Sequence, residues 1–145
     1  MDAHFYNVDI NWKSGRNGEM TSPELNTAVE VATPPQFPNG VEGIWSPEHL
    51  FTAAVASCLM TTFVAIAENS KLQFKEFACK SSGKLDRIDG KFLMTEVILE
   101  PTVVILNEED REKAERVLQK AEANCLISNS VNSKITMTPK IVVGS

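Results

Sequence analysis

Three cysteines, Cys58, Cys79 and Cys125, are the residues of this chain with the most specific chemistry. Their number is odd and they lie far apart, and there is no Cys-x-x-Cys or Cys/His pair at metal-ligand spacing. The sequence therefore predicts no disulfide framework, no zinc site and no other cofactor. No export signal is recognisable, so we expect the cytoplasm, where a disulfide is more often transient and catalytic than structural.

A reactive cysteine needs help to ionise. A free thiol has a pKa near 8.5, so only a small fraction of it is thiolate at neutral pH. A guanidinium beside the sulfur would lower that pKa and could also bind an oxygen. The alternatives are ordinary: Arg16 in a polar turn is by default exposed, and Cys58 and Cys125 on apolar helix faces can be core packing. Cys79 is predicted to be a buried strand residue without a role.

The longest predicted element is a helix that holds Cys58. Ser46-Pro47-Glu48 provides a cap residue, a proline at the first helical position and an acid near the positive end of the dipole. The helix should run to about residue 69, and residues 50–67 carry no charge. Because threonine, serine and alanine interrupt or dilute that run, we expect a helix buried on most faces and no membrane partner. A single small domain can hardly surround such a helix, which suggests a second subunit.

The other elements place the remaining candidates. We expect a strand over residues 5–12, a hairpin turn over 14–18 with positive φ at Asn17-Gly18, and a second strand, in one or two pieces, to about residue 32. A loop over 33–43 precedes the helix. Trp45 and Phe51 are candidates either for lining an apolar pocket or, equally, for core packing.

After the long helix, we expect strands over residues 73–86 and 91–106 joined at Asp89-Gly90, with Pro101 at a bulge or edge. Asn107 should cap a surface helix with a buried stripe, which reaches Cys125 if the helix continues that far. The stripe consists of Ala114, Val117, Leu118 and Ala121. A turn over 127–133 and a last strand over 135–143 complete the chain.

This order of elements indicates an α+β domain with a mainly antiparallel sheet. A length of 145 residues, 43% hydrophobic and 23% charged, suits one soluble domain over residues 1–145. The net charge of −5 and the scattered basic residues argue against nucleic acid as a partner.

Four local motifs resemble those of the OsmC/Ohr family of organic hydroperoxide reductases and osmotically inducible proteins. They extend the resemblance over nearly the whole chain and are an arginine turn, a helix start and two cysteine contexts: residues 14–18 (SGRNG), 46–51 (SPEHLF), 53–58 (AAVASC) and 123–128 (ANCLIS). The resemblance implies an OsmC-like fold, with mainly antiparallel sheets, a long buried central helix and an intertwined homodimer.

The resemblance also implies roles for four residues. Cys58 matches the family's peroxide-attacking cysteine, Cys125 its resolving cysteine, Arg16 the arginine that holds the thiolate, and Glu48 the glutamate that orients that arginine. Glu48 could equally serve only the helix N-terminus. One departure is Leu126, which stands where the family usually has proline and puts the local turn and the ease of disulfide formation in question.

We therefore expect a thiol-dependent peroxidase that reduces organic hydroperoxides through a sulfenic acid and a Cys58–Cys125 disulfide. A dithiol, in this family usually a lipoyl group, would restore both thiols. Two alternatives stay open: a redox protein acting on other thiols, and a non-catalytic ligand-binding or redox stress-sensing protein of the same fold.

Helix geometry adds an expectation about assembly. Ten residues separate Glu48 from Cys58, which is about 15 Å along a helix. Two side chains so placed on one straight helix cannot meet in one site. If both belong to one site, Glu48 must come from the second subunit of a two-fold dimer.

Overall fold

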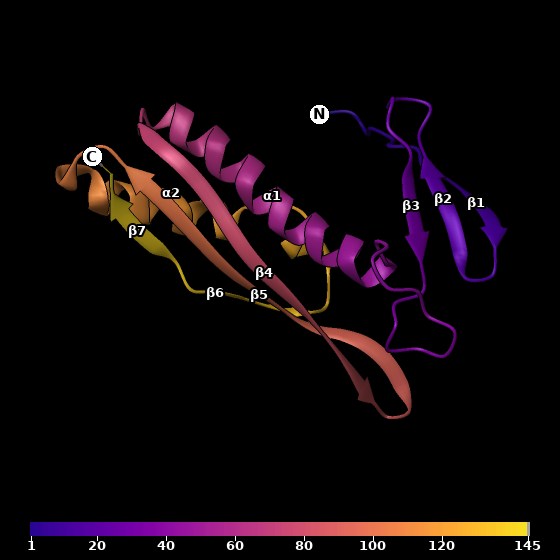
Figure 1. Cartoon of the computed structure of the whole chain (residues 1–145). Coiled ribbons are helices and arrows are strands. Elements are labelled where there is room, and N and C mark those ends of the chain that lie inside the picture. The colour runs from indigo at the N-terminus through magenta and orange to yellow at the C-terminus, as the bar shows by residue number, and fades with distance from the viewer. Residues whose placement is uncertain (145) are drawn as a thin grey trace. The chain divides into compact units, whose positions relative to one another are not determined.

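The structure is a computed structural model that describes residues 1–144. It consists of two compact units, Met1–Leu50 and Phe51–Ser145, and we describe each by itself. Figure 1 labels their helices and strands. The single domain expected over residues 1–145 stays a prediction.

The first unit contains a small antiparallel sheet. Its strands are β1 (Asp9–Ser14), β2 (Asn17–Thr21) and β3 (Val29–Ala32), in the order β1-β2-β3. The first strand begins later than expected, because residues 5–8 lie outside it. The second strand, expected in one or two pieces, is replaced by two strands, β2 and β3, which pair antiparallel with each other. Every residue of β1 is exposed in the single chain.

A two-residue turn joins β1 to β2. Ser14 pairs with Asn17, which leaves Gly15 and Arg16 between the strands. Gly15 has a φ of 53°, in the left-handed region that glycine adopts without strain. The prediction of positive φ at Asn17-Gly18 is therefore wrong, since both residues belong to β2. The indole N–H of Trp12 donates to the Gly15 carbonyl at 3.0 Å and stabilises the turn.

The long helix α1 (Pro47–Asn69) begins and ends as predicted. Ser46 is fully buried and caps it: the His49 amide donates to the Ser46 hydroxyl oxygen at 3.1 Å. By length and composition α1 could cross a membrane, but one of its faces belongs to the core. We expected α1 to be buried on most faces, but the single chain buries only that face, because Met60 and Val64 are exposed.

The second unit is built on a long hairpin. Strand β4 (Phe74–Ile88) runs antiparallel to β5 (Lys91–Ile105), and the predicted turn at Asp89-Gly90 is confirmed by φ values of 51° and 79°. The predicted last strand is two strands, β6 (Lys134–Met137) and β7 (Lys140–Val143), which pair with β5 one after the other. Both are parallel to β5, so the sheets are mainly but not wholly antiparallel.

Pro101 is in the central strand of this sheet, so its predicted place at a bulge or edge is wrong. Its neighbour two residues earlier, Leu99, accepts a hydrogen bond from Thr138 on the β6–β7 side. Because the backbone N–H and C=O groups of residues two apart in a strand point towards the same neighbouring strand, the backbone nitrogen of Pro101 points towards β6 and β7 too. There it lies opposite the break between β6 and β7, where the missing N–H removes no strand pairing.

Two helical segments follow β5. The 3₁₀ turn η1 (Glu108–Asp110) leads into α2 (Arg111–Ala123), whose predicted buried stripe is confirmed. Asn107 caps η1 only through its backbone carbonyl, which accepts from the Asp110 amide at 3.0 Å. The core joins this stripe to side chains of α1 and β5. Because α2 ends at Ala123, Cys125 lies beyond the helix that was expected to carry it; a short 3₁₀ turn, η2 (Ser128–Ser130), follows.

Candidate active site

The second unit brings Cys58 and Cys125 together as free thiols. Cys58 lies on the buried face of α1 and Cys125 just after α2. The Cys125 thiol donates to the Val55 carbonyl on α1 at 4.0 Å, one turn before Cys58. The single S–H of Cys125 can instead be donated to the Cys58 sulfur, which lies near enough for each thiol to shift the pKa of the other. Both are nearly dry, with 8% of Cys58 and 1% of Cys125 exposed in the single chain.

The end of α2 directs the chain towards this contact. Asn124 closes the helix, since its side-chain amide donates to the Lys120 carbonyl at 2.8 Å. Cys125 then follows with its amide still bound to the Glu122 carbonyl at 3.4 Å. The last residue of the helix, Ala123, is therefore two residues before the cysteine, and the hydrogen bond to Glu122 keeps Cys125 close to the helix end.

The environment of Cys58 favours its thiolate. Burial acts to raise the pKa of the Cys58 thiol, but four hydrogen bonds outweigh it and the pKa lies below its ordinary value. In decreasing order, the donors are the Ile127 amide, the Cys125 thiol, the Thr62 hydroxyl and the Leu126 amide. Thr62 lies one helical turn after Cys58, with its oxygen 3.8 Å from the sulfur.

The environment of Cys125 has the opposite effect. Burial raises the pKa of the Cys125 thiol, and the neighbouring Cys58 raises it further. The side chain and the amide of Ser128 act to lower the pKa of Cys125 but do not compensate. Cys58 therefore ionises first, and Cys125 remains a thiol that can donate to it.

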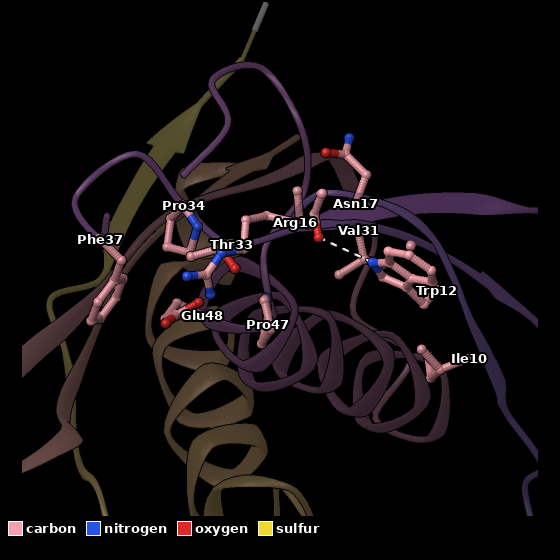
Figure 2. A pocket seen from close by; sticks show the side chains of 13 residues that line it. Ile10, Trp12, Arg16, Asn17, Val31, Thr33, Pro34, Phe37, Pro47 and Glu48 are labelled. Atoms are coloured by element: carbon pink, nitrogen blue, oxygen red, sulfur yellow. Dashed lines mark hydrogen bonds between the residues drawn. The ribbon is translucent and has the colours of Figure 1, made fainter. Parts of the chain in front are cut away.

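The first unit contains a cavity of about 550 Å³ around Arg16 and Glu48. Its wall is mainly apolar. Figure 2 shows the Arg16 guanidinium and the Glu48 carboxylate facing each other within it. The aromatic residues of the wall are Trp12 and Phe37, and not the Trp45 and Phe51 that the sequence suggested. The other apolar side chains of the wall are Ile10, Val31, Ala32, Pro34 and Pro47.

Local structure fixes both charged groups of the cavity. Arg16 is the second residue of the β1–β2 turn, and its carbonyl accepts from the Thr33 amide at 3.4 Å. Glu48 is the second residue of α1, and its Oε1 atom is buried. The helix dipole stabilises a carboxylate at that position. A half-buried acid beside an arginine in an apolar cavity is suited to orienting the guanidinium.

The wall opposite β1 depends on a tight loop after β3. The Phe37 amide donates to the Pro34 carbonyl at 3.1 Å, and the Gly40 amide to the Phe37 carbonyl at 3.0 Å. A Cβ atom on Gly40 would lie 2.0 Å from the Pro34 carbonyl oxygen, so only glycine fits there. This packing holds Pro34 and Phe37 at the cavity.

The structure thus groups the four predicted site residues as two pairs, each within one unit: Arg16 with Glu48, and Cys58 with Cys125. Among residues 1–144, no cluster of three or more His, Cys, Asp or Glu side chains could hold a metal ion.

Sequence reasoning missed the groups that surround the sulfurs. Thr62 could have been found, because it lies four residues after Cys58 and shares its helix face. Ser128 and the amides of Leu126 and Ile127 had no such signal, because any residue but proline carries an amide.

Comparison with known proteins identifies a family and several similar proteins. The family model for OsmC-like proteins matches residues 40–140. The uncharacterized protein YmaD of Bacillus subtilis (strain 168) is 27% identical over 139 residues, which are 94% of this chain and 91% of YmaD. An OsmC-like protein of unknown function from Vibrio cholerae has a similar structure, with a TM-score of 0.84 at 23% identity over 94% of this chain and 99% of its own.

A further solved structure has the same fold. An organic hydroperoxide resistance protein from Elizabethkingia anophelis has a TM-score of 0.77 at 21% identity and covers 99% of both chains. The family model spans more than half of the chain, and the fold of the relatives agrees with the α+β architecture described above. The chain belongs to the OsmC-like family.

Proposed function

We propose that this protein is a thiol-dependent peroxidase that reduces organic hydroperoxides through Cys58 and Cys125. The observation that carries the proposal is the pair of buried free thiols whose pKa values are shifted apart, Cys58 downwards and Cys125 upwards. Such a pair provides a nucleophile and a protonated partner in one place. Membership of the OsmC-like family, which points to a redox or stress role, supports it.

The proposed reaction has three steps. The Cys58 thiolate attacks the terminal oxygen of the hydroperoxide, the O–O bond breaks, and the leaving alkoxide takes a proton to become the alcohol. Cys58 is then a sulfenic acid. The Cys125 thiol condenses with it, so that an S–S bond forms and water leaves. An external dithiol supplies two electrons and two protons, restores both thiols and becomes a disulfide itself.

The cavity of the first unit suits the substrate. An apolar wall favours an alkyl or acyl chain over hydrogen peroxide. Arg16 provides several N–H donors for the two peroxide oxygens and a positive charge for the alkoxide as it forms. Glu48 holds the guanidinium in place and leaves its outer donors available. As the reductant we propose a dithiol, such as a lipoyl group, in the cytoplasm.

We propose that the working form is a homodimer with two sites. A single chain exposes large apolar side chains on β1 and on α1, which a soluble protein rarely leaves in water. Because Glu48 and Cys58 both belong to α1, about 15 Å of helix separates them. A site that contains both therefore takes its Arg16–Glu48 pair from one chain and its thiols from the other.

Titration with tert-butyl hydroperoxide tests the peroxidase. We expect the native protein to lose two thiols per chain, and mass spectrometry to find the Cys58–Cys125 disulfide. Cys125→Ser should instead accumulate a sulfenic acid at Cys58 that dimedone traps. If the native protein keeps all its thiols for hours in excess peroxide, the proposal fails and a ligand-binding role takes its place.

A further inference from the structure

The amides of Leu126 and Ile127 are consecutive donors to one sulfur, that of Cys58. We propose that these two N–H groups form a fixed cradle for the Cys58 thiolate, in which Leu126 provides a donor that proline at the same position would lack. The inference rests on the proposed role of Cys58 as the attacking group. It adds a positioning element that is built wholly within the second unit.

The peptide unit between Cys125 and Leu126 is anchored at its carbonyl end. In a trans peptide, the C=O of one residue and the N–H of the next point in opposite directions. The Cys125 carbonyl accepts from the Asn129 amide at 3.0 Å. The Leu126 N–H, which belongs to the same peptide unit, is therefore held facing away from Asn129, and it donates to Cys58.

The next two peptide units repeat this arrangement. The Leu126 carbonyl accepts from the Ser130 hydroxyl at 2.7 Å, and the Ile127 N–H of that unit donates to Cys58. The Ile127 carbonyl accepts from the Ser130 amide at 2.9 Å, and the Ser128 N–H of that unit donates to Cys125. Three successive peptide units are therefore each held by a hydrogen bond to the carbonyl, and their N–H groups donate to the two sulfurs. Such a run of backbone N–H groups is a site suited to an anion.

The remaining groups that face Cys58 within the second unit are neutral. Thr62 approaches from α1 and its hydroxyl can donate to the sulfur, and Cys125 approaches from the loop with one S–H that is donated either to the Val55 carbonyl or to Cys58. In a nearly dry site, fixed dipoles act strongly on a charge and need no rearrangement when the thiolate forms. The cradle therefore favours the thiolate of Cys58 without a cation from this unit, and a cation supplied elsewhere remains available for the peroxide.

The cradle predicts a difference between two substitutions at one position. Leu126→Pro removes a donor, whereas Leu126→Ala keeps the N–H and removes only the exposed side chain. We expect iodoacetamide to alkylate Cys58 in Leu126→Pro up to about tenfold more slowly at pH values where the native thiol is partly ionised, as for one hydrogen bond to a charged group. The midpoint of the pH profile should move upwards, and Leu126→Ala should follow the native profile. Coincident profiles for all three proteins would overturn the inference.

A measurement on the native protein avoids any effect of proline on folding. The amide proton resonances of Leu126 and Ile127 should shift with pH at the same midpoint as the alkylation of Cys58, and Cys58→Ser should abolish both shifts. Amide resonances that do not respond to the ionisation of Cys58 would contradict the cradle. Neither measurement contains peroxide, so a failure of the peroxidase proposal would not affect the result.

Discussion

The two pairs of candidate residues are built in different ways. The thiols of the second unit are nearly dry, lie on the helix α1 and in the loop after α2, and have only neutral donors around them among the described residues of that unit. Arg16 and Glu48 of the first unit are charged and line a wide cavity made by a turn, a loop and the start of a helix. The comparison suggests two separable tasks: the second unit makes the thiolate, and the first unit binds the peroxide and stabilises its departing oxygen.

Loss of the nucleophile should have the largest effect. Cys58→Ser should lower peroxide turnover on the order of 10³-fold or more, because a serine hydroxyl has no comparable nucleophilicity at neutral pH. Cys79→Ser is the matched control: Cys79 is a half-buried strand residue whose sulfur lies 3.5 Å from the Ser81 hydroxyl, and we expect near-native turnover. Coupled peroxide assays with dithiothreitol measure both. Substantial turnover in Cys58→Ser would move the chemistry to another residue.

Removing the guanidinium should separate the two tasks. Arg16→Gln should lower the rate constant for peroxide reduction about 10²-fold, as the loss of one transition-state donor does. The alkylation profile of Cys58 should change far less, because the donors of the second unit remain. Stopped-flow kinetics and iodoacetamide labelling measure the two quantities on one protein. An equal loss in both would mean that Arg16 and not the cradle ionises Cys58.

The same variant shows which chain supplies which pair. Arg16→Gln and Cys58→Ser, mixed after unfolding and refolding, form heterodimers in which one site can be complete if each site draws on both chains. Random pairing would then restore about a quarter of the native sites. If each site lies within one chain, no complete site forms and the mixture stays inactive.

Much of the fold followed from local patterns. The cap at Ser46, the turn at Asp89-Gly90 and the stripe from Ala114 to Ala121 each depend on side chains a few residues apart, and all three are confirmed. The prediction failed where a longer-range or competing effect decided. The last strand, predicted as one, is divided by a break that contains Pro139. The helix α2 does not reach Cys125, because the side chain of Asn124 closes it.

The candidate site was less accessible to sequence reasoning. The resemblance singled out Cys58, Cys125, Arg16 and Glu48, and the structure groups them as two pairs. The amides around Cys58 could not be predicted, because their direction is set by carbonyl contacts to residues 129 and 130. The sequence indicated only that residue 126 is not proline and therefore carries an amide N–H.

The smallest expected effect concerns the return of the thiols. When a dithiol attacks Cys58 in the disulfide, Cys125 leaves as a thiolate, and a leaving thiol with a lower pKa leaves faster. The Ser128 hydroxyl, whose oxygen is buried, lies beside Cys125 and lowers that pKa. Ser128→Ala should therefore slow the reduction of the disulfide by dithiothreitol about threefold to tenfold. The rate of sulfenic acid formation should not change, because the donors to Cys58 remain. Ser128→Thr keeps the hydroxyl and should behave like the native protein; equal reduction rates in the alanine and threonine variants would show that the second unit tunes only its nucleophile and not its leaving group.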